Sequence, residues 1–421
     1  MRLTLQRHHV RQLSFGETTK LHAGTLTVDR RALVQELLAD RRLAGVDLEI
    51  VRAGESCRIV PVFDVVEPRA KLEPAGADFP GILGPLQSAG EGVTRVLDGM
   101  AVTIVTPSEA AFRAAVLDMS STPFDGQDMP ALSRYAALQH LVIVPKLADG
   151  VDGNDIQQAL RIACLRAAVH LAREAQAGAP DAEEILELTS DAPGLPRVAY
   201  VFQLHSHQIP TVPGEPLLYG DNCRHLSPTI LHPNEVLDGG VVRSYYHQAM
   251  ETYDVQNHAV ILDLYRRHGR ELNFAGVVVN VANQLVEERD RCTIMSSNLV
   301  RWILKADGAV LSKSGGGAPN VDMMLVAERC EQLGIKTSMM MWETTSTGDA
   351  TDSALYSSPA LDAIVSLGSS GFQFDLGPVE RVIGALPEHV EAYKGGTQPA
   401  GLRLVGAIDH LGSGRYTAVR Y

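Results

Sequence analysis

Short β-branched runs separated by turn residues dominate the first hundred positions of this chain. Apolar and polar positions alternate within these runs, and glycine, proline and charged residues interrupt them, a pattern typical of β-strands. Beyond a first strand at the amino terminus, strands are predicted over residues 25–28, 46–51, 57–66, 100–105 and 141–144. Apolar residues at helical spacing then predict an amphipathic helix over 154–175. Residues 176–180 and the acidic residues 181–184 are expected to form a linker or an exposed loop before a strand over 197–204.

Beyond position 223 the pattern changes to strands that alternate with helices, which predicts a parallel sheet. The predicted strands cover 274–281, 308–311, 336–342 and 363–367, and the predicted helices cover 284–305 and 321–333. A closing β-hairpin is expected over 402–421. The predicted fold class is therefore α/β, with a β-rich N-terminal half and a parallel-sheet α/β C-terminal half. Open sheets of this kind place functional loops at the carboxyl ends of their strands, here residues 312–320, 343–351 and 368–371.

Composition excludes several kinds of partner. The 421 residues are 45% hydrophobic and 21% charged, as in an ordinary globular protein of two or three domains. The net charge of −13 argues against nucleic acid or an anionic membrane as a partner. No apolar stretch approaches the roughly 18 residues that would span a bilayer. The amino terminus lacks the apolar core of a secretion signal, so a cytoplasmic protein is expected.

The cysteines single out one position. There are five, an odd number without any C-x-x-C pair, which argues against disulfides and against a cysteine-based zinc site. Cys164 and Cys330 lie in apolar helical patterns and are expected in the core. Only Cys223 lies among polar turn-forming residues, in Tyr219-Gly-Asp-Asn-Cys-Arg-His225, where a thiol is available for chemistry.

The Asn222–Cys223 peptide is a candidate for self-cleavage. A thiol can attack the preceding carbonyl and move the acyl group from nitrogen to sulfur. β-Elimination then gives dehydroalanine, and its hydrolysis gives a pyruvoyl group and ammonia. The step needs a strained or polarised peptide and a proton acceptor, for which His225 is the nearest candidate in sequence. The dipeptide alone carries little information, and by itself it favours an ordinary loop cysteine.

Three other motifs are weak. Ser312-Lys-Ser-Gly-Gly-Gly317 reverses the order of a Walker A loop, and remains a glycine-rich loop suited either to a tight turn or to a carboxylate. Gly90-x-Gly-x-x-Arg95 lacks the third glycine of a dinucleotide fingerprint. His205-Ser-His207 has strand spacing, but no third ligand is evident, so no metal site is predicted.

Long stretches of the chain resemble one family. The matching N-terminal blocks are Val65-Val-Glu-Pro-Arg69 and Phe79-Pro-Gly81, and they are followed by the segment around Cys223. The matching C-terminal positions are Gly315–Gly317, Asn320, Asp322, Gly334–Thr337, Glu343, Asp349 and Ala363–Ser366. Together they resemble the proprotein subunit of component B of the glycine/sarcosine/betaine reductases, and its relative in D-proline reductase.

The resemblance implies a role for each matching position. In that family one internal cysteine becomes a pyruvoyl group as the chain cuts itself, which makes Cys223 the precursor and Asn222 the end of the first fragment. The implied regions are residues 1–222, β-rich, and 223–421, pyruvoyl-bearing. A small amine would be held as a Schiff base for reductive C–N cleavage. The implied substrate-binding residues are Gly316, Gly317, Asn320, Asp322, Glu343 and Asp349, and the acid/base candidates are His225 and His207.

The same resemblance implies a partner protein. The chain has no C-x-x-C pair and shows no selenocysteine, so it lacks a reductant of its own. A second subunit would carry the attacking cysteine or selenocysteine, and the expected assembly is a hetero-oligomer. Two alternatives remain: an uncleaved, non-catalytic assembly subunit of such a complex, and a stand-alone pyruvoyl-dependent decarboxylase.

Overall fold

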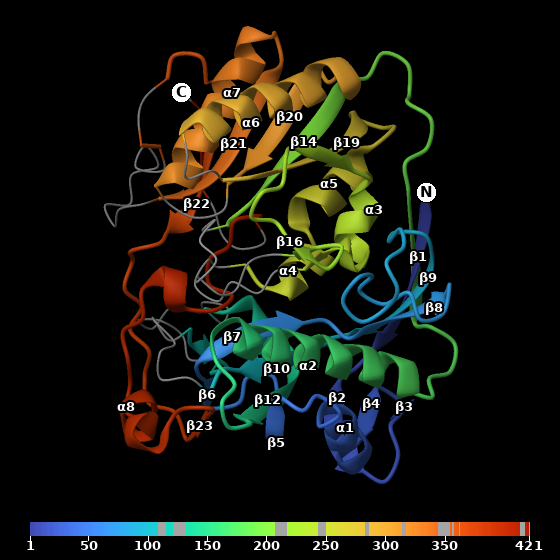
Figure 1. The fold of residues 1–421 in the computed structure, drawn as a ribbon, viewed down its shortest axis with the longest axis vertical. Coiled ribbons are helices and arrows are strands. Elements are labelled where there is room, and N and C mark those ends of the chain that lie inside the picture. The colour runs from blue at the N-terminus through green and yellow to red at the C-terminus, as the bar shows by residue number, and fades with distance from the viewer. Residues whose placement is uncertain are drawn as a thin grey trace.

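Two lobes, each mixing strands and helices, make up the molecule (Figure 1). The computed structural model describes residues 1–107, 115–120, 132–206, 217–242, 250–282, 286–313, 317–343, 354–355, 358–361 and 363–412, and the backbone of 417–420. The N-terminal half forms the lower lobe in the figure, and most residues beyond position 196 form the upper one. The α/β class is as predicted.

Two four-stranded sheets build most of the lower lobe. In spatial order, the first holds β13 (Ala182–Glu187), β1 (Arg2–His9), β9 (Gly92–Asp98) and β8 (Arg69–Glu73). The second holds β5 (Leu43–Val51), β12 (Gln139–Leu147), β10 (Met100–Val105) and β7 (Val62–Val66). A smaller sheet of β2 (Gln12–Gly16), β4 (Thr25–Asp29) and β3 (Lys20–His22) leads into helix α1 (Arg30–Leu37). The predicted β-rich N-terminal half is confirmed.

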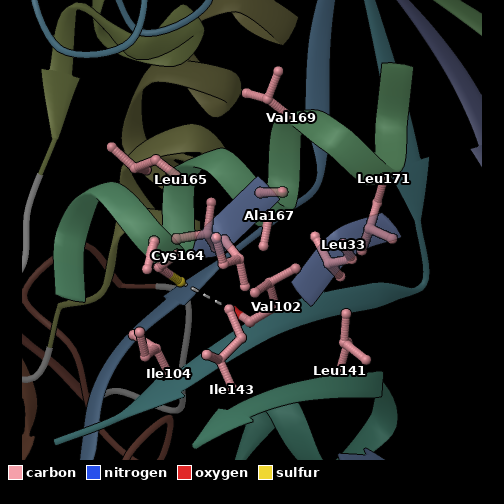
Figure 2. Close-up of a cluster of buried hydrophobic side chains, with 14 of the residues drawn as sticks. Leu33, Val102, Ile104, Leu141, Ile143, Cys164, Leu165, Ala167, Val169 and Leu171 are labelled. Atoms are coloured by element: carbon pink, nitrogen blue, oxygen red, sulfur yellow. Dashed lines mark hydrogen bonds between the residues drawn. The ribbon is translucent and has the colours of Figure 1, made fainter. Parts of the chain in front are cut away.

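Helix α2 (Gly153–Glu174) covers the core of the lower lobe. Its apolar face packs onto strand residues Val102, Ile104, Leu141 and Ile143, as Figure 2 shows. Cys164 lies in this contact, with its thiol 3.8 Å from the Val102 carbonyl, and burial raises the pKa of that thiol well above its usual value. Its prediction as a core cysteine is therefore correct.

A seven-stranded sheet forms the upper lobe. Its order is β17 (Thr229–Leu231), β19 (Asn273–Val281), β14 (Arg197–Leu204), β20 (Gly308–Ser312), β21 (Lys336–Glu343), β22 (Ala363–Ser369) and β24 (Thr417–Arg420). The five inner strands run parallel, whereas both edge strands pair antiparallel. The predicted parallel sheet is confirmed, and its carboxyl ends face the lower lobe (Figure 1).

Both faces of this sheet are covered, which explains why its strands are almost continuously apolar. Tyr200 and Phe202 of β14 point to the face packed by helix α5 (Ala259–Arg267). Ala199 and Val201 point to the opposite face, toward α6 (Val286–Asn298) with its π-helical extension Leu299–Ile303, and α7 (Ala318–Gln332). Across the described ranges, no helix is long and apolar enough to cross a membrane.

The two lobes exchange chain segments. Strand β14 precedes position 222, yet it lies between β19 and β20, which both follow it. In the other direction, β23 (Arg381–Ile383) pairs with β6 (Cys57–Ile59) of the lower lobe, together with β11 (Leu117–Asp118) and close to helix α8 (Val390–Lys394). The regions expected before and after position 222 are therefore interleaved in space.

Three expected elements differ from the structure. The strand expected over 57–66 is divided into β6 and β7 at Pro61, which has no N–H for a sheet ladder. Residues 182–184 of the expected loop belong to β13, an edge strand in which Glu183 and Glu187 are exposed and Glu184 lies 2.7 Å from Arg7. The hairpin expected over 402–421 does not form, because β24 pairs with the distant edge strand β22.

Candidate functional site

The Asn222–Cys223 peptide follows a two-residue hairpin. Strand β15 (Leu217–Leu218) pairs with β16 (Asp221–Asn222) on one side and β18 (Val241–Val242) on the other. Tyr219 and Gly220 form the turn, with φ values of 51° and 84°. Two positive φ values match the twist of such a hairpin. We call residues 217–226 the junction segment.

A backbone contact fixes this hairpin turn. A side chain at Gly220 would place its Cβ 2.3 Å from the Gly81 oxygen, and one at Gly81 would lie 2.2 Å from the Tyr219 oxygen. Neither position has room for a Cβ, so the two loops meet backbone to backbone. The motif Phe79-Pro-Gly81 therefore positions the turn that leads to Cys223.

Buried charged side chains in and near the motif Val65–Arg69 contact the part of the chain that follows the junction segment. The Arg69 guanidinium pairs with Glu67 and donates to the carbonyls of Leu237 and Gln256 at 2.9 and 3.0 Å. Asp238 accepts from Lys71 and from the hydroxyl of Thr94. Since these groups are buried and paired, the motif Val65–Arg69 has a structural role in joining the lobes.

Asn222 and Cys223 lie on opposite sides of the junction. Asn222 is exposed, and its side-chain oxygen accepts from the Arg224 N–H at 3.1 Å. Cys223 is 1% exposed and belongs to the apolar cluster of Leu204, Val236 and Leu237. Its carbonyl accepts from the Leu226 N–H at 3.2 Å. The thiol is thus held within the fold while the residue before it faces outward.

A pocket of about 250 Å³ adjoins the outward side of the junction. It lies between the first turns of α2 and the hairpin, and its lining residues are Asn154, Gln157, Gln158, Arg161, Leu217, Gly220, Asp221, Asn222 and Arg224. Arg161 and Arg224 were not predicted from the sequence as site residues. Arg224 could have been noticed as a cation directly after the cysteine, but only the fold brings Arg161 to the same pocket.

A buried lysine at the carboxyl end of β20 was also overlooked. Lys313 is 1% exposed, its Nζ lies 5.1 Å from the centre of the Trp342 ring, and burial lowers its pKa to about 7. The neighbouring Glu343 accepts a hydrogen bond of 2.6 Å from the Ser366 hydroxyl. A lysine that directly follows an apolar strand was a signal in the sequence, but it was considered only as part of a phosphate loop.

The start of α7 carries the other described candidates. Gly317 is the residue before the helix, with a φ of 67°, and its carbonyl accepts from the Asn320 N–H at 3.0 Å. Asn320 is fully buried. The buried Asp322 forms an ion pair with the half-buried Arg289, which joins α7 to α6. We call Lys313, Gly317, Asn320, Asp322 and Glu343 the strand-end residues.

For the remaining predicted site residues, the structure gives few or no contacts. His225 is exposed on the turn after Cys223, and within the described part of the chain no hydrogen bond or ion pair involves its ring. His207, Gly316 and Asp349 lie outside the described residues. In the ranges that the structure describes, no group of three or more His, Cys, Asp or Glu side chains could hold a metal ion.

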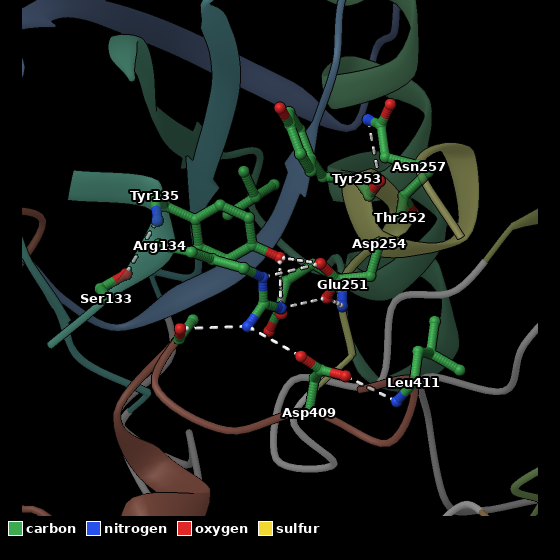
Figure 3. A network of polar contacts seen from close by, with 12 residues as sticks. Ser133, Arg134, Tyr135, Glu251, Thr252, Tyr253, Asp254, Asn257, Asp409 and Leu411 are labelled. Carbon is green, nitrogen blue, oxygen red and sulfur yellow. Dashed lines mark hydrogen bonds and ion pairs between the residues drawn. The ribbon is translucent and has the colours of Figure 1, made fainter. Parts of the chain in front are cut away.

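A second buried cluster joins the lobes close to helix α4 (Thr252–Gln256), as Figure 3 shows. The Arg134 guanidinium lies 2.7 Å from Asp254 and 3.3 Å from Asp409. The Tyr135 hydroxyl lies 2.7 Å from Asp254 and 3.2 Å from Glu251. Burial, followed by the charge of Asp254, raises the pKa of Glu251 to about 8. Glu251 therefore keeps its proton at neutral pH.

Comparisons with known proteins cover almost the whole chain. The sequence profile of the glycine/sarcosine/betaine reductase component B subunits matches residues 1–410. The glycine reductase complex component B subunits alpha and beta of Acetoanaerobium sticklandii are 32% identical over 97% of this chain and 95% of theirs. The sarcosine reductase complex component B subunit alpha of Peptoclostridium acidaminophilum is 30% identical over 94% of this chain and 92% of its own. No solved structure matches the chain.

Proposed function

This chain belongs to the family of glycine/sarcosine/betaine reductase component B subunits, as its sequence motifs indicated, and we propose that it is the amine-binding subunit of a reductase complex. Its substrate would be a small amine or amino acid whose C–N bond is cleaved reductively. In this proposal the chain matures by cutting itself between Asn222 and Cys223. The observation that carries the proposal is the placement of that peptide.

The junction fits the formation of a pyruvoyl group. Hydrogen bonds to the Asn222 side chain and to the Cys223 carbonyl hold both sides of the peptide, and the thiol is kept within the fold. A thiol adjacent to its own acceptor carbonyl needs no diffusion to reach it, which makes the attack effectively unimolecular. The exposed Asn222 side leaves room for the departing fragment end.

The maturation balances without an external oxidant or reductant. The Cys223 sulfur attacks the Asn222 carbonyl carbon, the C–N bond breaks, and the amine takes a proton. β-Elimination then breaks the C–S bond, leaving a thiocarboxylate on Asn222 and dehydroalanine at position 223. Water replaces the amine of dehydroalanine, which departs as ammonia. A second water hydrolyses the thiocarboxylate to a carboxylate and hydrogen sulfide.

Once formed, the pyruvoyl carbonyl supplies an electrophile that can hold a small amine as a Schiff base and withdraw electrons from its C–N bond. The residues of this chain orient the substrate and exclude water. We assign orientation to Gly316, Gly317, Asn320, Asp322, Glu343 and Asp349, and proton transfer to His225 and His207. The electron-rich sulfur or selenium comes from a partner subunit, and the working assembly is a cytoplasmic hetero-oligomer.

Intact mass spectrometry tests the maturation. The purified protein should give two chains, residues 1–222 and a blocked chain of 199 residues beginning at the former Cys223. Borohydride with a candidate amine should trap an adduct on the second chain alone. One full-length species with an alkylatable thiol at Cys223 would instead identify an uncleaved assembly subunit.

A turnover assay tests the need for a partner. The isolated protein should bind its amine but release no deaminated product with a simple dithiol. Product should form only after addition of the subunit that carries the nucleophile. Sustained turnover by this chain with dithiol alone would refute the subunit assignment and would point to Cys57 or Cys292 as an internal nucleophile.

A further inference from the structure

The pocket beside the junction has an unusual lining for a surface pocket. Asn154, Gln157, Gln158 and Arg161 recur every three or four residues, so they form one face of the first turns of α2. Arg224 and Asp221 close the pocket from the junction segment. Two guanidinium groups thus oppose the single carboxylate of Asp221, and the remaining polar side chains are amides. Such a lining suits an anion.

The placement of Asn222 and Cys223 decides which part of the junction faces this pocket. Asn222 lines it, whereas Cys223 points into the apolar cluster on the opposite side. A substrate attached at position 223 would therefore lie away from the pocket. The group that reaches the pocket is the end of the first fragment.

The proposed cleavage changes the charge of the group that Asn222 presents to the pocket. Before it, Asn222 and Cys223 share a neutral peptide bond. After hydrolysis of the thiocarboxylate, Asn222 carries a new α-carboxylate beside Arg224, whose backbone N–H already lies 3.1 Å from the Asn222 side-chain oxygen. Arg161 is 6% exposed and cannot turn away into water. A guanidinium that is already positioned beside a carboxylate can form charge-assisted hydrogen bonds with it, which are stronger than neutral ones.

We propose that this pocket is the receptor for the new C-terminal carboxylate of Asn222, held by Arg224 of the second fragment and Arg161 of the first. The inference rests on the proposed cleavage. It assigns the pocket a role after maturation: the charged end is kept in place, and it ties the two fragments together across the cut.

Carbodiimide-driven coupling of glycinamide to the mature two-fragment protein tests the receptor. Mass spectrometry of the last peptide of fragment 1–222 measures the reaction rate of the Asn222 carboxylate, and it separates any remaining thiocarboxylate by mass. A guanidinium-paired carboxylate reacts slowly. We expect Arg224→Gln to accelerate coupling on the order of tenfold, the effect of losing one charge-assisted contact.

Three further variants sharpen the test. Arg224→Lys keeps the charge and should remain close to wild type. Asp221→Asn removes the competing carboxylate and should slow coupling severalfold. Arg291→Gln is the matched control, since it removes an exposed arginine of the same fragment on α6 and should leave the rate unchanged.

The outcomes separate this inference from the proposed function. If the wild-type protein forms no fragments, the cleavage itself is refuted, and the receptor with it. If fragments form but wild type and Arg224→Gln couple at equal rates, only the receptor is refuted. Loss of cleavage in both Arg224→Gln and Arg224→Lys would also overturn it, because the guanidinium would then act in the cleavage step.

Discussion

The junction segment and the strand-end residues are built in opposite ways. At the junction, the groups that we propose to react are neighbours in the chain, and a hairpin and a glycine contact hold them in place. At the strand ends, the residues come from separate strands and helices, and all except Gly317 are buried. The carboxylates of Asp322 and Glu343 contact Arg289 and Ser366, which lie more than twenty residues away along the chain. A damaged junction should therefore stop maturation, whereas damaged strand ends should affect the mature protein.

The largest effect should come from the thiol itself. Cys223→Ala should abolish the formation of fragments. Alanine has no side-chain nucleophile that could accept the acyl group and then leave by β-elimination. Denaturing electrophoresis and intact mass measure this directly. Cys292→Ala, a partly exposed cysteine on α6, is the matched control and should split normally. Splitting of the Cys223→Ala protein would place the cleavage chemistry elsewhere.

The second-largest effect should come from a change at the glycine contact that supports the hairpin. Gly81→Ala places a methyl group against the Tyr219 carbonyl and strains a positive φ of 81°, so the turn must move. We expect fragment formation to slow at least about tenfold, since small displacements of reacting groups are costly. Gly178→Ala, where no atom lies within 4 Å of the added Cβ, is the control. Equal rates of cleavage in both variants would show that the loop contact is dispensable.

Strand-end substitutions should separate maturation from turnover. Glu343→Gln and Asp322→Asn should still yield two fragments, but reduce turnover with the partner subunit about 30-fold, the loss of one buried charged contact. Glu388→Gln, on the exposed turn before α8, should change neither. If either strand-end variant fails to split, that residue belongs to the maturation machinery.

The smallest effect on maturation and turnover should come from the cluster at α4, whose pH dependence acts on stability. The folded protein keeps a proton on Glu251 up to about pH 8, whereas the unfolded chain releases it near 4.5. Stability should therefore fall as pH rises between these values, by at most about 1.4 kcal/mol per pH unit. Burial also raises the pKa of Asp64 to about 7, which acts in the same direction.

Glu251→Gln isolates this contribution because it mimics the protonated side chain. Urea unfolding at pH 5.5 and 8 should show a smaller decline for the variant than for wild type, with a residual slope from Asp64. The Tyr135 hydroxyl and the Asp254 carboxyl, which contact the Glu251 side chain, remain beside the new amide. An identical decline in both proteins would show that Glu251 is ionised in the folded state throughout this range.

Most elements could be predicted because their signals are local. The apolar strands 197–204 and 274–281 and the helices 154–175 and 321–333 occur within a few residues of their predicted bounds. The acidic strand β13 was missed because an edge strand is held by backbone pairing and needs no apolar side chains. The prediction of a closing hairpin was wrong because β24 pairs with β22. Turn residues in the sequence do not indicate which distant strand at the edge of a sheet will pair with a segment.

The sequence by itself determined the fold class, the family and the position of Asn222–Cys223, because each rests on residues close together along the chain. The tertiary structure alone decided that β14 lies inside a sheet built mainly by later residues, that Gly81 supports Gly220, and that Arg161 meets Arg224 at one pocket. These contacts join positions more than sixty residues apart. Burial and backbone packing bring them together, and neither can be inferred from local pattern.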